Sequence, residues 1–395
     1  MHNLTTFSLF YLANFLQAGT YGLTFLLPRL FADFGANEKD VGLMLIITTV
    51  FTLISVFFTG HLTDKLGRMV SLVLSGAAIA ISLFLFANAN RIGVNTISAS
   101  ALLGFGWGVF YALGPVVLTS ITAAKNRVRY FSLLTVFIMA GFGLSPVMTS
   151  MMESAAYSVS TAFYAMAIVC LISAMIFLYL KPAIRKLTEA NNYGATNNIR
   201  SRINLSIVSQ VIQSPARLPL FMVCLGASVF AGMNNFQTVF ADEKGLRYAD
   251  FFLTYTVTVI VCRLLIVGFI GSKNLYRAIA VLQYITCFSI VVFMFIGGNQ
   301  PMYLLVAVLF GIGYGASYPL LAAMAANDAN KDIVPQTLQL FALTYFIGIF
   351  GFPMIAGWLI TEFSITPLLV LITVLAFIEA SLAYRRSVST GTVAP

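Results

Sequence analysis

The chain has 395 residues, of which 59% are hydrophobic and only 9% are charged, and its formal net charge is +9. Ordinary soluble domains contain about 25% charged residues, so this composition excludes a protein that is dispersed in water. We therefore predict an integral membrane protein. The short alternating segments of a membrane β-barrel are missing from the sequence, so we expect the apolar spans to be helices.

Apolar stretches of about 20 residues, long enough to cross a bilayer, recur along the whole chain. In chain order they cover 5–31, 41–59, 70–87, 96–121, 130–152, 160–180, 218–240, 250–271, 275–297, 302–326, 336–360 and 366–384. The first stretch is longer than a signal-peptide core and has neither a basic leader nor a cleavage site, so we expect it to be a span. The predicted fold class is an all-α membrane protein with twelve transmembrane helices.

Basic residues are distributed unevenly between the connections. The even-numbered connections and the C-terminal tail contain 16 Lys and Arg residues, whereas the odd-numbered connections contain 5. By the positive-inside rule, this bias predicts that both termini and the long middle connection lie in the cytoplasm, at a bacterial-type inner membrane. The net charge then reflects membrane topology, and nucleic acid is not an expected partner.

Four short motifs of the first half recur in the second half, in the same order and at an offset of 207 to 209 residues. The pairs are LFAD 30–33 with VFAD 239–242, GHLTDKLGRM 60–69 with GFIGSKNLYR 268–277, GFGWGVFY 104–111 with GIGYGASY 311–318, and GFGLSP 141–146 with GIFGFP 348–353. Because internal repeats define an architecture, we predict two pseudo-symmetric six-helix bundles, at 1–180 and 218–395. The cytoplasmic linker at 181–217 ends in INLSIVSQVIQ, whose pattern predicts an amphipathic helix on the membrane surface.

The connection after the second span carries a specific motif. It matches the pattern G-x-L-x-D-[RK]-x-G-R at Gly60, Leu62, Asp64, Lys65, Gly67 and Arg68. Together with twelve spans in two duplicated halves, this motif resembles the major facilitator superfamily of secondary transporters over the whole chain. The resemblance implies two parallel six-span repeats, alternating access, and a substrate cavity lined chiefly by spans 1, 4, 7 and 10.

The resemblance also implies a cytoplasmic gate that latches the halves together when the protein is open outward. Its expected residues are Gly60, Asp64, Lys65, Gly67, Arg68, Arg127 and Arg129. We expect Gly60 and Gly67 to permit a tight connection of about ten residues. Asp64 is expected to accept hydrogen bonds from Arg127 or Arg129, or to cap the start of a helix of the second half. In the second copy Ser272 replaces the acid, so the latch is expected to be one-sided; the alternative is a plain turn with basic anchors.

Arg263 is the charged residue that we expect deepest inside a span, since it follows Phe251 by ~18 Å along a helix axis. No Asp or Glu is expected in the middle of a span; Glu379 comes closest, near the predicted cytoplasmic end of the last one. A buried guanidinium without a carboxylate needs backbone carbonyls, water or an anionic ligand. Arg263 is therefore a candidate substrate ligand, and the resemblance offers structural support of the gate as a second interpretation.

Polar and aromatic side chains in the spans expected to line the cavity complete the candidate site. They are Asn14, Gln17 and Tyr21 in span 1, Trp107 and Tyr111 in span 4, Asn234, Asn235 and Gln237 in span 7, and Tyr314 and Tyr318 in span 10. The three residues of span 1 are spaced three and four apart and share one helix face, which we expect to line the cavity. The alternatives are hydrogen bonding between helices for the polar residues and packing around glycines for the aromatic ones.

The leading functional hypothesis is a secondary transporter of a small anionic or polar organic solute, such as a carboxylate or a siderophore. Exporters of lipophilic cations need a buried negative group to offset desolvation, and none is expected here. A broad exporter of drugs or metabolites from the same superfamily and a non-transporting receptor are the alternatives. Because no G-x-x-x-x-G-K-[ST] motif occurs, we expect no nucleotide or other cofactor, and a gradient must drive transport.

Proton coupling, by symport or antiport, is left open: the substrate carries the proton, a peripheral acid such as Asp33 or Asp242 carries it, or transport is uncoupled. GFGLSP only partly resembles the antiporter signature of the family, and the Arg that relatives use for proton coupling early in span 4 is missing from ISASALLG. An enzyme is disfavoured, because the two histidines lie outside the spans and no buried acid pair is expected. A channel is disfavoured by the absence of charged rings. The expected partners are a small-molecule substrate and the lipid bilayer, with no bound metal, and the expected state is a monomer.

Overall fold

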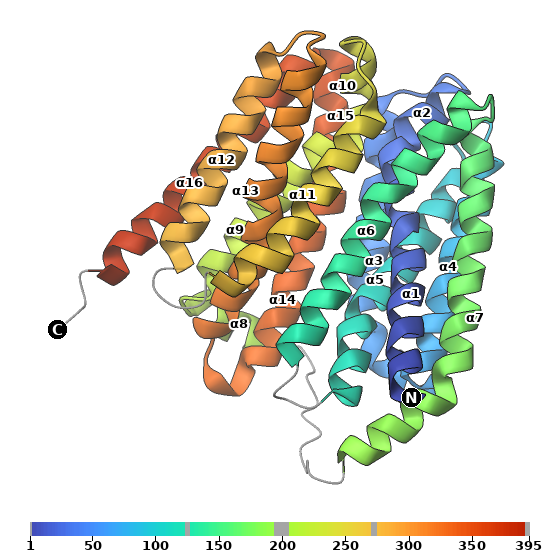
Figure 1. The fold of residues 1–395 in the computed structure, drawn as a ribbon, viewed down its shortest axis with the longest axis vertical. Helices are drawn as coiled ribbons and strands as arrows, with labels where there is room; N and C mark the ends of the chain where they lie inside the picture. Colours follow the sequence, from blue (N-terminus) through green and yellow to red (C-terminus); the bar gives the residue numbers. More distant parts are fainter. Residues whose placement is uncertain (1, 123–126, 193–204, 270–274, 392–395) are drawn as a thin grey trace. The chain divides into compact units, whose positions relative to one another are not determined.

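The computed structural model describes residues 2–122, 127–192, 205–269 and 275–391, and all the regular structure within these ranges is helical (Figure 1). The elements are α1 (His2–Gly22), η1 (Leu23–Leu26), α2 (Leu27–Ala32), α3 (Glu38–Leu66), α4 (Arg68–Ala87), α5 (Val94–Ile121), α6 (Arg127–Ser154), α7 (Val159–Asn192), α8 (Leu205–Gln213), α9 (Arg217–Asn235), α10 (Gln237–Glu243), α11 (Tyr248–Phe269), α12 (Leu275–Phe295), α13 (Gln300–Asn327), η3 (Lys331–Ile333), α14 (Val334–Phe346), η4 (Ile347–Gly351), α15 (Phe352–Glu362) and α16 (Ile365–Gly391).

The predicted fold class is confirmed. Within the described ranges, eleven helical stretches are long and apolar enough to cross a membrane. The remaining predicted span, 5–31, is formed by α1, η1 and α2 in succession. The α8 helix occupies the stretch predicted to be amphipathic, whereas residues 193–204 of the predicted linker lie outside the described ranges.

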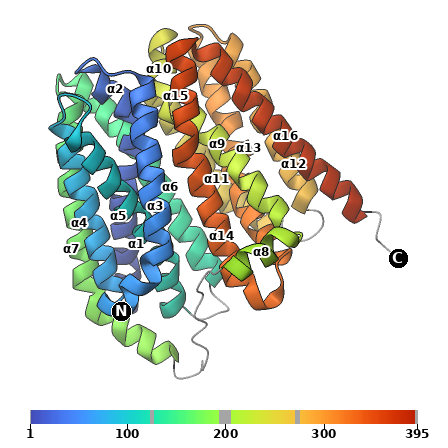
Figure 2. The ribbon, with the colours of Figure 1, turned by 180° about the vertical axis from the view of Figure 1, so that it is seen from behind.

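By its contacts the chain divides into two compact units. The first contains Met1–Ala36 and Ile47–Arg200, and the second contains Asn37–Ile46 and Ser201–Pro395. In the first unit α4 packs against α5 and α7, and α1 packs against α6 and α7 (Figures 1 and 2). In the second unit α12 lies between α13 and α16, and α11 packs against α13.

Glycines of the repeated motif allow this close packing. In the first unit, a Cβ atom on Gly104 of α5 would lie 2.3 Å from the carbonyl oxygen of Thr48 in α3. In the second unit, a Cβ atom on Gly313 of α13 would lie 2.6 Å from the carbonyl oxygen of Leu282 in α12. Small residues let membrane helices approach backbone to backbone. The recurrence of GxGxG in both halves therefore has a packing cause.

The segment 37–46, at the start of α3, belongs to the second unit through contacts with α15. A Cβ atom on Gly42 would lie 2.5 Å from the carbonyl oxygen of Pro353, and one on Gly357 would lie 2.1 Å from that of Glu38. Lys39 Nζ also lies 3.0 Å from Glu362 Oε1, in an exposed ion pair. Exposed pairs contribute about 0–1 kcal/mol, so the close backbone contact is the main attachment of this segment.

The connection between α3 and α4 is shorter than predicted. The α3 helix extends to Leu66 and α4 begins at Arg68, so Gly67 alone makes the turn, at a φ of +82° that favours glycine. Gly60 lies inside α3 with open space where a Cβ atom would be. The expectation that Gly60 permits a tight turn is therefore wrong, because the helix continues through the polar motif.

The last helix is longer than predicted. We expected the span to end at 384, before Arg385 and Arg386, but α16 continues to Gly391. Helices tolerate basic residues in their final turns, so Arg385 and Arg386 do not end α16. As a result Glu379 lies near the middle of α16, and the expectation that no acid occupies the middle of a span is wrong.

Candidate functional site

Gln17 lies in the core of the first unit. Its Nε2 atom donates to Ser75 Oγ of α4 at 2.9 Å, and the Ser173 hydroxyl of α7 lies 3.3 Å from its Oε1 atom. Ser173 also donates to the carbonyl oxygen of Ala13 at 2.8 Å. The side chain is fully buried. These contacts favour the interpretation of Gln17 as a hydrogen-bonded link between α1, α4 and α7.

The other candidates of the first unit contact different neighbours. Tyr21 stacks on Trp107 of α5, with 4.9 Å between ring centroids, and also packs against Phe142 of α6. Tyr111 is half-buried, with its ring 6.3 Å from that of Trp107. Asn14 is fully buried, and its Oδ1 atom has no hydrogen-bond partner among the described residues. The candidates of span 1 thus point to several helices of their own unit.

Asn234, Asn235 and Gln237 lie in the second unit at the break between α9 and α10. Their amide nitrogens are engaged: Asn234 donates to the carbonyl oxygen of Phe230 at 2.9 Å, Asn235 to that of Ala231 at 3.1 Å, and Gln237 to the Tyr303 hydroxyl at 2.6 Å. All three side chains are buried, and none of their side-chain oxygens has a hydrogen-bond partner within the described ranges. Buried polar atoms are normally satisfied, so this break presents three acceptors without donors.

Arg263 of α11 is 6% exposed, and its Nε atom donates to the carbonyl oxygen of Gly315 in α13 at 3.3 Å. That carbonyl is four residues before Pro319, which lies inside α13 and has no N–H group. Its ordinary helical donor is therefore missing, and the guanidinium supplies another. Such substitutes are what allow proline inside membrane helices. The geometry supports a structural role for Arg263.

Tyr314 and Tyr318 of α13 line a narrow pocket in the second unit. The Tyr314 ring stacks on Phe230 of α9 at 4.7 Å, and the Tyr318 ring meets Tyr345 of α14 edge-on at 5.0 Å. The pocket is too tight to hold a water molecule in this conformation. Its other lining residues are Val223, Gly226, Ala227, Gln283, Ser317, Leu321 and Glu379.

Glu379 is the residue of this pocket that the sequence analysis missed. Its side chain is fully buried, and its Oε1 atom accepts from Gln283 Nε2 at 2.9 Å. Its Oε2 atom has no hydrogen-bond partner among the described residues. Glu379 lies ~21 Å along the helix axis from Ile365 at 1.5 Å per residue. That distance could have indicated an acid deep in the span. The sequence analysis instead placed Glu379 near the end of the span, because Arg385 and Arg386 follow it.

Four of the gating candidates, Asp64, Lys65, Gly67 and Arg68, lie at the junction of α3 and α4. Asp64, Lys65 and Arg68 are exposed on either side of the Gly67 turn. The predicted pairing of Asp64 with Arg127 or Arg129 lies outside what the structure describes, because neither arginine side chain is included. Ser272 of the second copy also lies outside the described ranges.

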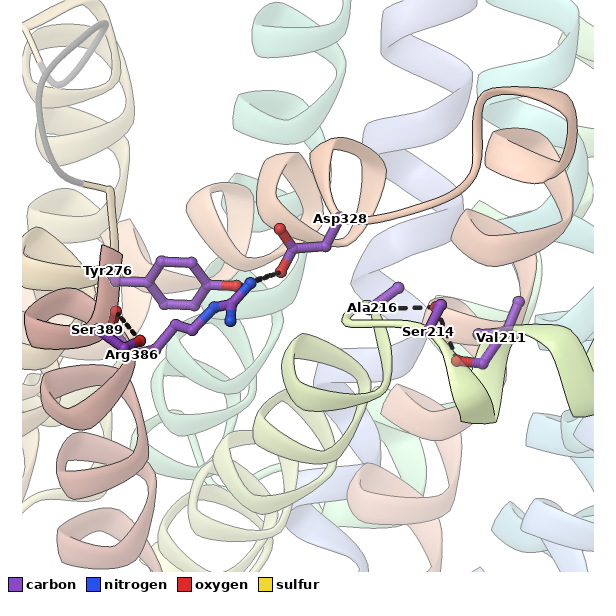
Figure 3. A network of polar contacts seen from close by, with 7 residues as sticks. All are labelled: Val211, Ser214, Ala216, Tyr276, Asp328, Arg386 and Ser389. Carbon is purple, nitrogen blue, oxygen red and sulfur yellow. Dashed lines mark hydrogen bonds and ion pairs between the residues drawn. The ribbon is translucent and has the colours of Figure 1, made fainter. Parts of the chain in front are cut away.

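A polar cluster joins three helices of the second unit at one end (Figure 3). The Tyr276 hydroxyl of α12 donates to Asp328 Oδ2, just after α13, and Arg386 of α16 lies 3.9 Å from the same oxygen. The Arg386 guanidinium also lies over the Tyr276 ring, 5.6 Å from its centroid. Figure 3 also shows Ser214, which closes the turn between α8 and α9 through bonds to Val211 and Ala216.

We expect Asp328→Ala to lower the free energy of unfolding by about 1–2 kcal/mol, because it removes a charged hydrogen bond and a partly buried ion pair. Thermal unfolding of the purified protein in detergent measures this. Asp332→Ala is the matched control, since Asp332 is exposed in the next connection. Equal melting temperatures for the two variants would contradict a stabilising role of the cluster.

Two repeated helical units with twelve spans define a multi-pass helical membrane protein. Residues 7–353 match the sequence profile of the Major Facilitator Superfamily. The chain therefore belongs to this family, as the motif at 60–68 indicated. Members of the family are transporters, so the protein is a membrane transporter and not an enzyme.

Curated relatives match a part of the chain. The "Multidrug resistance protein MdtL" of Escherichia coli O9:H4 (strain HS) is 22% identical over 202 residues, which is 51% of this chain and 51% of the relative. The proteins of the same name from Shigella flexneri and Escherichia coli O157:H7 match with the same identity and coverage. The match thus spans about half the length of these relatives.

Proposed function

We propose that this protein is a secondary transporter that exports small organic solutes across the inner membrane by alternating access of its two bundles, 1–180 and 218–395. Family membership supports a transport function. The absence of a nucleotide-binding motif from the sequence supports transport that is driven by a gradient and not by ATP. The bias of basic residues supports cytoplasmic termini. The printed name of the MdtL relatives supports export of drug-like compounds. In this proposal the exposed residues around Gly67 and the arginines of α6 act as the gate.

The substrates in this proposal are amphipathic molecules that carry N–H or O–H donors. The observation that carries it is the set of buried acceptors at the break between α9 and α10, on Asn234, Asn235 and Gln237. A donor group of the solute would satisfy these oxygens, whereas a carboxylate would leave them unpaired at a cost of about 1–3 kcal/mol each. Export of drugs or metabolites that carry such donors therefore fits better than transport of simple carboxylates.

An anionic or polar solute bound through Arg263 is the second candidate. A buried guanidinium inside a span favours it. The hydrogen bond from Arg263 to Gly315 gives the same residue a structural reason for its position. Arg263 therefore supports an anionic substrate less strongly than the unpaired acceptors support a donor.

The test uses the purified full chain and three probes of different chemistry. Ethidium is a cation with amino donors, tetraphenylphosphonium is a cation without N–H donors, and ionised succinate is an organic anion without N–H or O–H donors. We expect ethidium to raise the melting temperature and to be transported in proteoliposomes, because a ligand stabilises the state that it binds. Stabilisation and transport of succinate alone would favour the second candidate, and an absence of any transport would contradict the proposal.

We expect Asn234→Ala and Asn235→Ala each to weaken ethidium binding by about tenfold, the equivalent of one lost hydrogen bond of about 1.4 kcal/mol. Titration of ethidium fluorescence on the purified protein measures the dissociation constant. Gln210→Ala is the control, because the Gln210 amide is exposed on α8 and bonds only within its own helix in the described structure. Unchanged affinity in both asparagine variants would place the binding groups elsewhere.

A further inference from the structure

The carboxyl group of Glu379 lies at a position whose counterpart in the first unit is occupied by neutral side chains. It links α16 to Gln283 of α12 beside Gly226 of α9. In the first unit, the corresponding helices α7, α4 and α1 meet at Ser173, Ser75 and Gln17. Ser173 and Glu379 are 206 residues apart, Ser75 and Gln283 are 208 apart, and Gln17 and Gly226 are 209 apart. These distances equal the offset of the internal repeat within one residue. In the first unit, this position is therefore filled by a hydrogen-bonded network of uncharged side chains.

The second unit differs at all three paired positions: Gly226 replaces Gln17, Gln283 replaces Ser75, and Glu379 replaces Ser173. Gly226 has no side chain where Gln17 of the first unit supplies an amide, and the acid stands where the first unit has Ser173. A Cβ atom on Gly226 would lie 2.9 Å from Glu379 Oε2. The space left by the missing side chain is thus occupied by the carboxyl group and the narrow pocket next to it.

No positive charge faces this carboxyl group among the described residues. From α9 it meets Val223, Gly226 and Ala227, and from α12 it meets Gln283. From α13 the pocket is lined by Tyr314, Ser317, Tyr318 and Leu321, so that two phenols are the titratable groups on its walls. On α16 itself the next charged residues are Arg385 and Arg386, more than one turn away, and Arg386 is directed at Asp328.

The environment favours the neutral acid. A buried carboxylate without a counter-charge is strongly disfavoured, and a single amide donor does not replace the water that it loses. Neutralisation requires one proton on the carboxyl group. The unpartnered Oε2 atom, which faces Gly226, is the position left for it, since Oε1 accepts from Gln283.

We propose that Glu379 is the binding site of an exchangeable proton that couples transport to the proton gradient, an inference that rests on the proposed transport function. The carboxyl group holds the proton in the conformation described here. When the pocket lined by Tyr314 and Tyr318 opens to water, the O–H bond of the acid breaks, the proton passes to water, and a carboxylate is left. Reprotonation from the other side of the membrane completes the exchange.

The first experiment detects the proton without any substrate. Infrared difference spectra of the purified protein between acidic and alkaline pH are expected to show the carbonyl stretch of a carboxylic acid in apolar surroundings. Labelling wild-type protein with 13C-carboxyl glutamate is expected to shift this band, and Glu379→Gln is expected to remove it. Ser173→Ala, at the matched place of the first unit, should retain it. A missing band in the wild type, or a band that persists in Glu379→Gln, would overturn the proposal.

The second experiment separates coupling from transport. Proteoliposomes with wild-type protein are expected to accumulate ethidium at least tenfold when a pH gradient is applied. With Glu379→Gln the response to the gradient should be lost, while movement of ethidium down its own gradient stays within twofold of wild type. Glu379→Ser, which copies the neutral residue of the first unit, should behave in the same way. A full response to the pH gradient in either variant would refute the role of Glu379.

These two readouts distinguish the proton site from the proposed function. If the wild type moved no ethidium by any gradient, the transport proposal would fail for this probe, and the infrared band would still decide whether Glu379 binds a proton. If wild-type protein moved ethidium but the pH gradient did not change its accumulation, the transport proposal would stand and the coupling proposal would be wrong.

Discussion

Arg263→Ala is expected to destabilise the protein by about 1–3 kcal/mol, because it removes the donor of a buried carbonyl group. The carbonyl of Gly315 accepts from Arg263 Nε and has no helical donor at Pro319. Denaturant or thermal unfolding of the purified protein measures the loss. Arg68→Ala is the control of the same chemistry, since Arg68 is exposed at the start of α4.

A double-mutant cycle with Pro319→Ala tests this explanation directly. Alanine at 319 restores an N–H group four residues after Gly315, so the carbonyl regains its helical partner. In that background the cost of Arg263→Ala is expected to fall by about 1 kcal/mol, a coupling that distant, independent sites do not show. Equal costs in both backgrounds would contradict the structural role. If Arg263 were instead an anion ligand, its loss would abolish anion transport whatever residue stands at 319.

Gly104→Ala is expected to destabilise the first unit by about 1–3 kcal/mol or more through overpacking. The added Cβ atom would lie 2.3 Å from the Thr48 carbonyl oxygen and 3.0 Å from the Thr52 amide nitrogen. Both contacts are to backbone atoms of α3, which cannot rotate away as a side chain could. The melting temperature in detergent and the yield of folded protein report the effect.

Gly60→Ala is the matched control for this substitution. Gly60 also lies inside a helix, but nothing lies within 4 Å of the position of its Cβ atom. Alanine there is expected to be neutral or to stabilise the protein by up to about 1 kcal/mol, the difference in helix propensity. Similar melting temperatures for the two variants would mean that α3 and α5 can separate without cost.

The sequence was sufficient to predict the helices and their repetition, because bilayer thickness and backbone hydrogen bonding leave little choice for long apolar stretches. Helix ends were predicted less well, since charged residues were taken as ends at 60–69 and 385–386, although both stretches are largely helical.

The neighbours of each side chain were the least predictable part of the candidate site. Spacing shows which residues share a helix face, but the helix that packs on that face depends on tertiary structure. Gln17 is bonded to α4 and α7, whereas Tyr21 stacks on α5. The importance of Glu379 likewise depends on Gly226 and Gln283, which are distant from it in sequence.

The close approach of Gly226 to Glu379 also has an evolutionary consequence. A Cβ atom at 226 would lie 2.9 Å from Glu379 Oε2, the far end of a flexible side chain, so alanine there would require the acid to shift, and a larger side chain would compete with the carboxyl group for the same space. Homologues with a residue larger than alanine at this position should therefore carry a shorter side chain at 379, and those with the acid should keep a small residue at 226. The two positions should covary across the family and sort its members into those that have this acid and those that do not.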